Sequence, residues 1–250
     1  LIEAERGRRI VLSVHDFTGH MTDLDGRLRA MRSTGAEITK VAVATDSLTD
    51  LVRLRQFGQR NADNGRQILI GMGAAGVTSR VLPDLFESSW TYAGDGVAPG
   101  QLSVGQMRDE YRIRSLGKGS ELFGVLGKPL RHSLSPAMHN AGFRAIQRNA
   151  VYLPFEAANI EDFERFADEF NVAGASVTAP YKTAAMAKSV KVDELSRRVG
   201  AVNTLMMKDG GWHARNTDVP GFLEPLYGRM KLEECRATVL GAGGAARGVV

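Results

Sequence analysis

A regular alternation of apolar runs with amphipathic segments constrains the fold of the first 113 residues more than any other feature. Four apolar or aromatic runs begin about every 22 to 29 residues, and a segment with helical spacing of apolar residues follows each run. This pattern is typical of βα units joined into a parallel sheet. The predicted strands are 9–14, 38–45, 66–73 and 89–96, and the predicted helices are 22–35, 46–62, 78–86 and 103–113.

Four βα units are half of the number that closes a (β/α)8 barrel. Four strands alone leave open edges and an uncovered sheet face. We therefore expect this segment to be the second half of a longer fold that continues before Leu1.

A second βα series follows residues 114–120, which have the composition of a linker. Asp209, Gly210 and Gly211 favour a turn, so residues 201–218 are predicted to form a β-hairpin. A last strand is expected from Ala237, and the sequence stops where a helix should begin. The other predicted strands are 121–127, 150–157 and 174–180, and the other predicted helices start near Pro136, span 159–170, start near Tyr181 and span 219–230.

The composition excludes several classes of protein. Apolar residues make up 43% and charged residues 24%, which is usual for globular domains, and no apolar run is long enough to cross a membrane. The net charge of +4 comes from dispersed basic residues, which argues against a nucleic-acid stripe and suits small anionic substrates. The single cysteine, Cys235, excludes an internal disulfide and favours ordinary packing. We predict a cytoplasmic protein without a metal site and without nucleic-acid or membrane partners.

Lys40 lies within an apolar strand, and His15 follows the strand before it. One βα unit separates them, so they are expected on neighbouring strands. Burial lowers the pKa of an amine, a neutral amine can form a Schiff base with a ketone, and an imidazole moves protons near neutral pH. Simpler interpretations are a lysine that reaches solvent from a sheet edge and a histidine that packs in the core or caps a helix.

Two further side chains are expected at the same face of the sheet. Arg80 lies near a helix start and suits a carboxylate, and Gln101 lies in the loop 98–103. The convergence of four such residues on one face favours the functional interpretation.

At these positions "VHDF", "TKVAVAT", "GMGAAGVTSR" and "APGQLSV" closely resemble type I 3-dehydroquinate dehydratase, from residue 8 to about 112. The resemblance implies the C-terminal half of that barrel, with Lys40 forming the imine and His15 as the acid and base. Val97 departs from the hydroxyl residue that is frequent in the family. Substrate contacts are implied for Met72, Arg80 and Gln101.

Hydroxyl and amide side chains follow the strands of the second series, at strand exits and at the hairpin end. Such groups suit a polyhydroxylated acid, and Lys182 with Asp218 would form an ammonium–carboxylate pair that protonates a carbonyl becoming an alcohol. Simpler interpretations are a helix cap for Ser135, a surface ion pair for Lys182 and Asp218, and a turn residue for Asn216. The polar candidates are Ser133, Ser135, Thr178, Asn203, Asn216 and Thr217.

The segment "VLGAGGAARG" is a glycine-rich turn expected between a strand and a helix. Its glycines would let backbone amides approach a pyrophosphate closely at the helix N-terminus, although alanine takes the last glycine position of G-x-G-x-x-G. The predicted cofactor-binding residues are Gly241, Ala242, Gly243, Gly244 and Ala245.

Together "FGVLGKPLRHSLSPAMHN", "GASVTAPYK", "GAVNTL", "NTDVPGF" and "VLGAGGAARG" closely resemble shikimate dehydrogenase, from about residue 121 to 250. The resemblance implies that Lys182 and Asp218 are the catalytic pair and that the glycine loop binds NADP. Ser176 stands where the family commonly has Asn. A grip on the substrate carboxylate is implied for Ser133 and Ser135, helped by Thr178, Asn203 and Thr217.

These two families catalyse consecutive steps of the route to chorismate and the aromatic amino acids. We hypothesise a bifunctional shikimate-pathway enzyme that dehydrates 3-dehydroquinate and reduces 3-dehydroshikimate to shikimate with NADPH. The alternatives are a monofunctional shikimate dehydrogenase with a vestigial barrel and a non-catalytic binding or regulatory module. We expect the 250-residue stretch alone to have little of either activity. The predicted domains are the half barrel 1–114, a linker 115–120, a substrate-binding domain 121–235, and 236–250 as the first strand and glycine loop of an NADP-binding domain.

Overall fold

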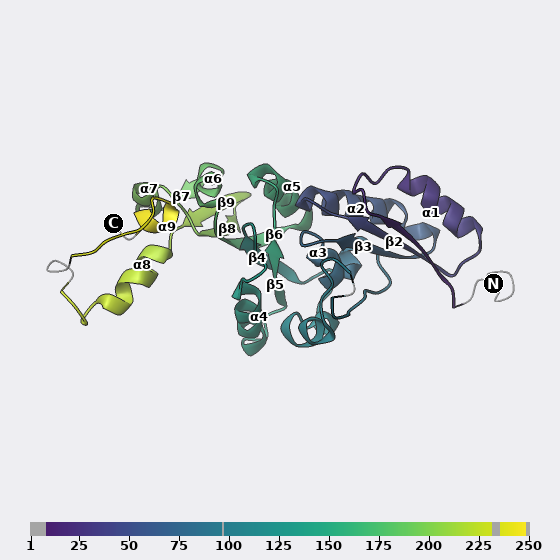
Figure 1. Cartoon of the computed structure of the whole chain (residues 1–250), viewed down its shortest axis with the longest axis horizontal. Helices are drawn as coiled ribbons and strands as arrows, with labels where there is room; N and C mark the ends of the chain where they lie inside the picture. The colour runs from purple at the N-terminus through teal and green to yellow at the C-terminus, as the bar shows by residue number, and fades with distance from the viewer. Residues whose placement is uncertain (1–8, 97, 232–235, 249–250) are drawn as a thin grey trace.

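The computed structural model describes residues 9–96, 98–231 and 236–248, and its strands form two sheets. The first is a parallel sheet of β1 (Val11–Asp16), β2 (Ile38–Ala44) and β3 (Arg66–Met72), in that order. The second has the order β5 (Ala150–Phe155), β4 (Glu121–Leu126), β6 (Val172–Val177), β8 (Thr204–Lys208), β9 (Gly211–Arg215) and β7 (Lys191–Val192). The predicted α/β class is confirmed. Figure 1 shows the first sheet at one end of an elongated molecule and β7 to β9 toward the other.

In the first part of the chain, up to residue 115, each strand is followed by a helix. These helices are α1 (Leu24–Ser33), α2 (Leu48–Arg60) and α3 (Val77–Val81). The start of α2 is fixed by a capping box, in which the Ser47 hydroxyl accepts from the Asp50 amide and the Asp50 carboxylate accepts from the Ser47 amide. Three of the four βα units predicted from the sequence are therefore confirmed.

The fourth unit is different from the prediction. Residues 89–96 run without a strand ladder, because they make only isolated backbone bonds, such as those from Ser89 to Gln67 and from Gly94 to Leu102. The helix expected over 103–113 is replaced by a π-helical turn at Gln106–Glu110 and a 3-10 turn at Ile113–Ser115. A chain segment without a continuous partner strand cannot pair its backbone groups as a strand does.

Pro83 divides the helix that was expected over 78–86. The structure has α3 before it and a 3-10 helix, Pro83–Phe86, that starts at the proline itself. Proline has no backbone N–H to continue an α-helix, and it is tolerated in a first turn. Two more short 3-10 helices span Ala62–Asn64 and Glu224–Leu226.

The second part of the chain, residues 121–231, has parallel strands β5, β4 and β6 and the predicted hairpin, β8 with β9. The short strand β7 pairs with β9 in parallel, and neither it nor the helix after it was predicted. The helices of this part are α4 (Ser135–Ala145), α5 (Ile160–Phe170), α6 (Lys182–Ala187), α7 (Glu194–Val199) and α8 (Asp218–Leu223).

The strand expected from Ala237 is wrong. Residues 236–243 belong to no sheet, and the chain then forms a single short helix, α9 (Gly244–Arg247). A strand needs a partner for its backbone groups, and none of the described strands lies beside this segment. Cys235 and Val97 lie outside the described residues.

One hydrophobic cluster runs through both parts of the chain. It includes Leu51 and Leu54 of α2 together with Phe163 and Phe166 of α5, and all four side chains are buried completely. The division into domains at 114 to 121 remains a prediction, because the two sheets share this core. In the described part of the chain, no helix is long and apolar enough to span a membrane.

Candidate functional site

A cavity of about 390 Å³ is lined by residues of the first sheet and of the loops that follow it. Lys40 of β2 lies opposite Ser13 of β1, so it shares a sheet face with His15, two residues further along β1. The loop after β3 leads into α3, which carries Arg80. The five residues predicted for this site therefore line one cavity, namely His15, Lys40, Met72, Arg80 and Gln101.

The Lys40 amine lies in a partly desolvated and cationic environment. Its Nζ is 4.6 Å from the centroid of the Tyr92 ring. Burial lowers the pKa of Lys40 below its usual 10.5, and the nearby Arg80 guanidinium lowers it further. Both effects increase the fraction of neutral amine, which is the nucleophilic form.

Two buried polar atoms of residues that line the same cavity lack a hydrogen-bond partner within the described structure. Arg80 is only 2% exposed, and it donates to the Pro99 carbonyl at 3.3 Å, but its Nε has no hydrogen-bond partner. The Gln101 Oε1 is also without a partner. Buried polar atoms are nearly always satisfied, so this pattern fits a ligand that carries a carboxylate and hydroxyls.

Two aromatic residues of the cavity were missed by sequence reasoning. Phe17 is 74% exposed and stacks on His15 with ring centroids 6.0 Å apart, and Tyr92 approaches Lys40 as described. Tyr92 lies in the segment 89–96, which the sequence predicts as a strand and which forms a loop in the structure. The sequence does contain a signal for such residues, namely an aromatic side chain in a loop that follows a strand at the face where the candidate residues gather.

In the second part of the chain, an ion pair joins the first residues of α6 and α8. The Lys182 Nζ donates to the Asp218 Oδ2 at 2.5 Å. The Lys182 side chain is 19% exposed and that of Asp218 is 40% exposed, so the pair can be reached from solvent.

Asn203 orders this ion pair. Its Nδ2 donates to the Asp218 Oδ1 at 2.6 Å and to the Thr217 hydroxyl at 2.9 Å, and its Oδ1 accepts from the Thr217 amide at 2.9 Å. The Asn203 carbonyl accepts from the Val177 amide at the end of β6. Four predicted residues, Lys182, Asn203, Thr217 and Asp218, thus form one hydrogen-bonded group.

The loop before Ser133 and Ser135 and the loop that carries Thr178 lie beside each other. The Lys128 amide donates to the Ala179 carbonyl at 3.2 Å, and a Cβ on Gly127 would lie 2.3 Å from the Thr178 methyl group. Ser133 and Ser135 sit at the start of α4, where the Ser135 amide donates to the Ser133 hydroxyl. No described hydrogen bond joins these serines or the Thr178 side chain to Lys182.

The Asn216 side chain bonds to backbone groups in this structure. It is 3% exposed, its Nδ2 donates to the Ala201 carbonyl, and its Oδ1 accepts from the amides of Asp218 and Val219. These contacts satisfy the side chain and hold the start of α8. Substrate binding by Asn216 remains a prediction. The contacts seen here agree with the simpler interpretation of Asn216 as a turn residue.

The glycine loop approaches the ion pair. A Cβ on Gly244 would lie 2.9 Å from that of Ala201 and 3.5 Å from the Lys182 Cδ. Gly241 has a φ of +118°, in the region that favours glycine. The loop backbone therefore lies close to Lys182 at a point where a side chain would not fit.

Comparison with known families matches both parts of the chain. Residues 1–118 match the family described as type I 3-dehydroquinase, and residues 125–205 match the shikimate dehydrogenase substrate binding domain. A bifunctional 3-dehydroquinate dehydratase/shikimate dehydrogenase, chloroplastic, from Arabidopsis thaliana is 30% identical over 261 residues, which cover 96% of this chain and 43% of the relative.

Two further relatives cover different shares of the chain. A shikimate dehydrogenase (NADP(+)) of Syntrophobacter fumaroxidans is 45% identical over 131 residues, 52% of this chain and 46% of that protein. The solved structure of dehydroquinate dehydratase and shikimate dehydrogenase from S. pombe AroM is 27% identical, covers 95% of this chain and 47% of its own, and superimposes with a TM-score of 0.43. The chain spans about half the length of the curated relatives it matches.

Proposed function

We propose that the protein is a bifunctional shikimate-pathway enzyme, because residues 1–118 match the type I 3-dehydroquinase family and residues 125–205 match the shikimate dehydrogenase substrate binding domain. It dehydrates 3-dehydroquinate to 3-dehydroshikimate, and it reduces 3-dehydroshikimate to shikimate with NADPH. The observation that carries the proposal is the shared cavity of His15, Lys40 and Arg80, with its partnerless buried polar atoms.

In the first reaction, the neutral Lys40 amine attacks the ketone of 3-dehydroquinate, and loss of water gives an imine. His15 removes the proton next to the imine carbon and returns a proton to the leaving hydroxyl. Arg80 binds the substrate carboxylate, Gln101 binds a hydroxyl, and Met72 packs against the ring. Hydrolysis of the product imine releases 3-dehydroshikimate and restores Lys40.

In the second reaction, the Lys182 ammonium gives a proton to the carbonyl oxygen that becomes an alcohol. Asp218 accepts a hydrogen bond from this ammonium, and Asn203 in turn donates to the Asp218 carboxylate and holds it in place. The hydroxyls and amides assigned to substrate binding are Ser133, Ser135, Thr178, Asn203, Asn216 and Thr217.

Two features of the glycine loop support dinucleotide binding: Gly241 has a φ of +118°, which favours glycine, and the Gly244 backbone lies so close to Ala201 that a Cβ would be only 2.9 Å from the Ala201 Cβ. We assign pyrophosphate binding to residues 241–245, that is Gly241, Ala242, Gly243, Gly244 and Ala245. When bound, NADPH supplies the hydride for the reduction.

The partners of the protein are small molecules, and a cytoplasmic location is inferred from the sequence. The Arabidopsis relative is described as chloroplastic, so the compartment is a separate question from the chemistry. Fractionation of the source cells tests this location.

The dehydratase assignment is tested by Lys40→Ala in the full-length protein. This variant should lose dehydration and keep reduction, and borohydride should trap a substrate adduct on the parent and not on the variant. Lys118→Ala is the control, because Lys118 is an exposed partner of Glu87 and should leave both activities unchanged. Dehydration that survives in the Lys40 variant would refute the imine.

A parent protein that reduces 3-dehydroshikimate and never dehydrates 3-dehydroquinate would instead support a vestigial barrel. A parent without either activity would support a binding module.

A further inference from the structure

Helices α2 and α5 are neighbours, although they belong to different parts of the chain (Figure 1). Asp162 near the start of α5 contacts Leu48 and Thr49 at the start of α2, and Glu169 near the end of α5 contacts Arg55 further along α2. Both contacts have the same offset in residue number, 114, between Leu48 and Asp162 and between Arg55 and Glu169. Seven residues are about two turns of each helix, and a constant offset means that both chains advance in the same direction, so the two helices are parallel.

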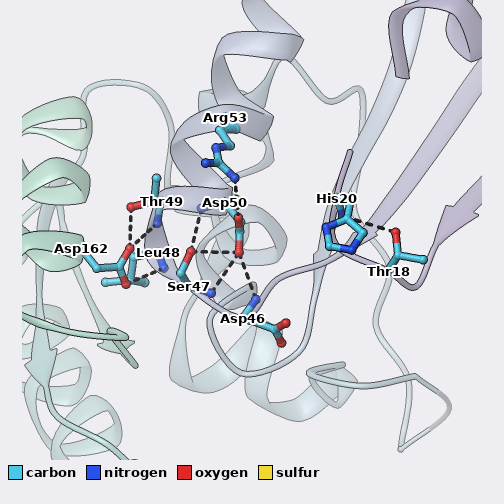
Figure 2. A network of polar contacts seen from close by, with 9 residues as sticks. All are labelled: Thr18, His20, Asp46, Ser47, Leu48, Thr49, Asp50, Arg53 and Asp162. Atoms are coloured by element: carbon cyan, nitrogen blue, oxygen red, sulfur yellow. Dashed lines mark hydrogen bonds and ion pairs between the residues drawn. The ribbon is translucent and has the colours of Figure 1, made fainter. Parts of the chain in front are cut away.

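Asp162 is buried near the start of both helices, and Figure 2 shows its carboxylate bonded to Leu48 and Thr49 of α2. Its Oδ2 accepts from the Leu48 amide at 3.0 Å and from the Ala158 amide at 2.8 Å. Its Oδ1 accepts from the Thr49 amide at 2.7 Å and from the Thr49 hydroxyl at 2.6 Å. One carboxylate of the second part therefore caps the helix that follows the Lys40 strand in the first part.

Electrostatics explain why a carboxylate occupies this position. In a parallel pair, the partially positive N-terminal ends of the two helices lie next to each other and repel. An anion between them opposes this repulsion and satisfies amide donors that the helices themselves leave free. Asp162 is 5% exposed, so the screening by water that weakens surface pairs is largely absent.

Arg55 contacts the other end of α5. Its guanidinium donates to the Glu169 backbone carbonyl, pairs with the Glu169 carboxylate at 3.4 Å, and lies over the Phe170 ring at 4.9 Å from the centroid. The Phe170 ring also contacts Phe86 of the first part, with centroids 5.4 Å apart. Between the two polar contacts, the apolar faces of α2 and α5 join the shared core.

We propose that α2 and α5 form an internal docking surface that makes the two parts of the chain one cooperative folding unit, with Asp162 as the group that holds the surface closed. This inference does not depend on the proposed function. Its consequence is that the two candidate sites keep a fixed relative position, because neither part moves without breaking the shared helix pair.

The chain carries its own probes, since it has two tryptophans, one in each part. Trp90 lies beside the apolar cluster of the first sheet, and Trp212 is buried in β9 of the second. Trp212→Phe leaves Trp90 as the fluorophore, and Trp90→Phe leaves Trp212. Urea unfolding of these two backgrounds reports each part separately.

We expect the Trp90 and Trp212 curves to coincide when Asp162 is present. With Asp162→Ala in both backgrounds, the curves should separate by about 1 M urea, because the bonds from Asp162 to the start of α2 are lost and this end of the helix pair is weakened. Asp162→Asn is the milder variant if the alanine protein does not fold, and its curves should separate in the same sense by less.

Two controls isolate the surface. Asp168→Ala removes an exposed carboxylate of the same helix and should leave the curves coincident. Asp50→Ala removes the local capping box of α2 and should shift both curves together. Curves that differ in the parent would overturn the single folding unit, and curves that still coincide in both Asp162 variants would overturn the role of Asp162.

Discussion

Replacement of Lys182 by alanine tests the second site, because the structure separates its effect on the reaction from its effect on stability. The Lys182 ammonium has one carboxylate partner, Asp218, at 2.5 Å, and both side chains are partly open to solvent. Ion pairs of this exposure contribute about 0 to 1 kcal/mol. Asp218 also keeps its bond from the Asn203 Nδ2 at 2.6 Å, so the carboxylate is not left without a donor. The free energy of unfolding should fall by less than about 1 kcal/mol.

The effect on reduction should be much larger. A positioned proton donor typically contributes a factor of about 10² to 10⁴ to a rate. That factor corresponds to about 3 to 5 kcal/mol of transition-state stabilisation. The loss of activity should therefore exceed the loss of stability several-fold, and most molecules of the variant should remain folded.

The assay follows NADPH oxidation by the full-length protein with 3-dehydroshikimate, and dehydration of 3-dehydroquinate is measured in the same samples. Lys188→Ala is the matched control, because Lys188 pairs with Glu161 and Glu164 at 3.2 and 2.9 Å, away from Asp218. A Lys182 variant that keeps more than about a tenth of the parent kcat for reduction contradicts the role of proton donor. Equal loss of both activities would instead indicate a folding defect.

Three further predictions concern other residues. Asn203→Ala should lower kcat/KM for reduction about tenfold, because Asp218 and Thr217 lose a shared partner, and steady-state kinetics of the full-length protein measure it. Phe166→Ala should lower the free energy of unfolding by about 3 to 5 kcal/mol in urea titrations, since its buried ring stacks on Phe170 at 4.5 Å, whereas the half-exposed Phe222→Ala should change it little. Lys40→Met should stabilise the protein at neutral pH, because the folded-state pKa of Lys40 is lowered and the unfolded chain binds that proton more tightly. The difference in free energy of unfolding between variant and parent is fully present below the lowered pKa and fades as pH rises toward the usual 10.5. Urea titrations at increasing pH should therefore show the stability of the parent approaching that of the variant.

The sequence was sufficient to predict the elements whose signals are local. The strand with Lys40, the capped helix after it and the hairpin around Asp209 and Gly210 each carry their own apolar pattern or turn residues, and all three are present. The strands expected at 89–96 and from Ala237 failed for one reason. A strand depends on a neighbour, and the sequence of one segment does not tell whether that neighbour is there.

For the candidate sites, the sequence indicated which polar residues stand at strand exits, but not how each one is used. Asn216 and Asn203 have the same side chain and flank the same hairpin, yet one bonds backbone groups and the other holds Asp218. Their difference depends on a few ångströms of loop geometry. The role of Asp162 could not be predicted for a related reason, because its partners in α2, Leu48 and Thr49, lie more than a hundred residues away in the chain.

The two lysines proposed for catalysis show how the fold assigns opposite tasks to one residue type. Lys40 lies against Tyr92 and near the cationic Arg80, and its described contacts include no carboxylate, so its surroundings favour the neutral amine that attacks a ketone. Lys182 has the Asp218 carboxylate at 2.5 Å, so its surroundings favour the charged ammonium, which can give a proton to the substrate. Exchanging these environments should exchange the chemistry: a carboxylate placed beside Lys40, as in Met72→Glu, should raise the pKa of Lys40. Borohydride trapping at neutral pH should then slow, and trapping at an unchanged rate would show that burial and Arg80 do not control this amine.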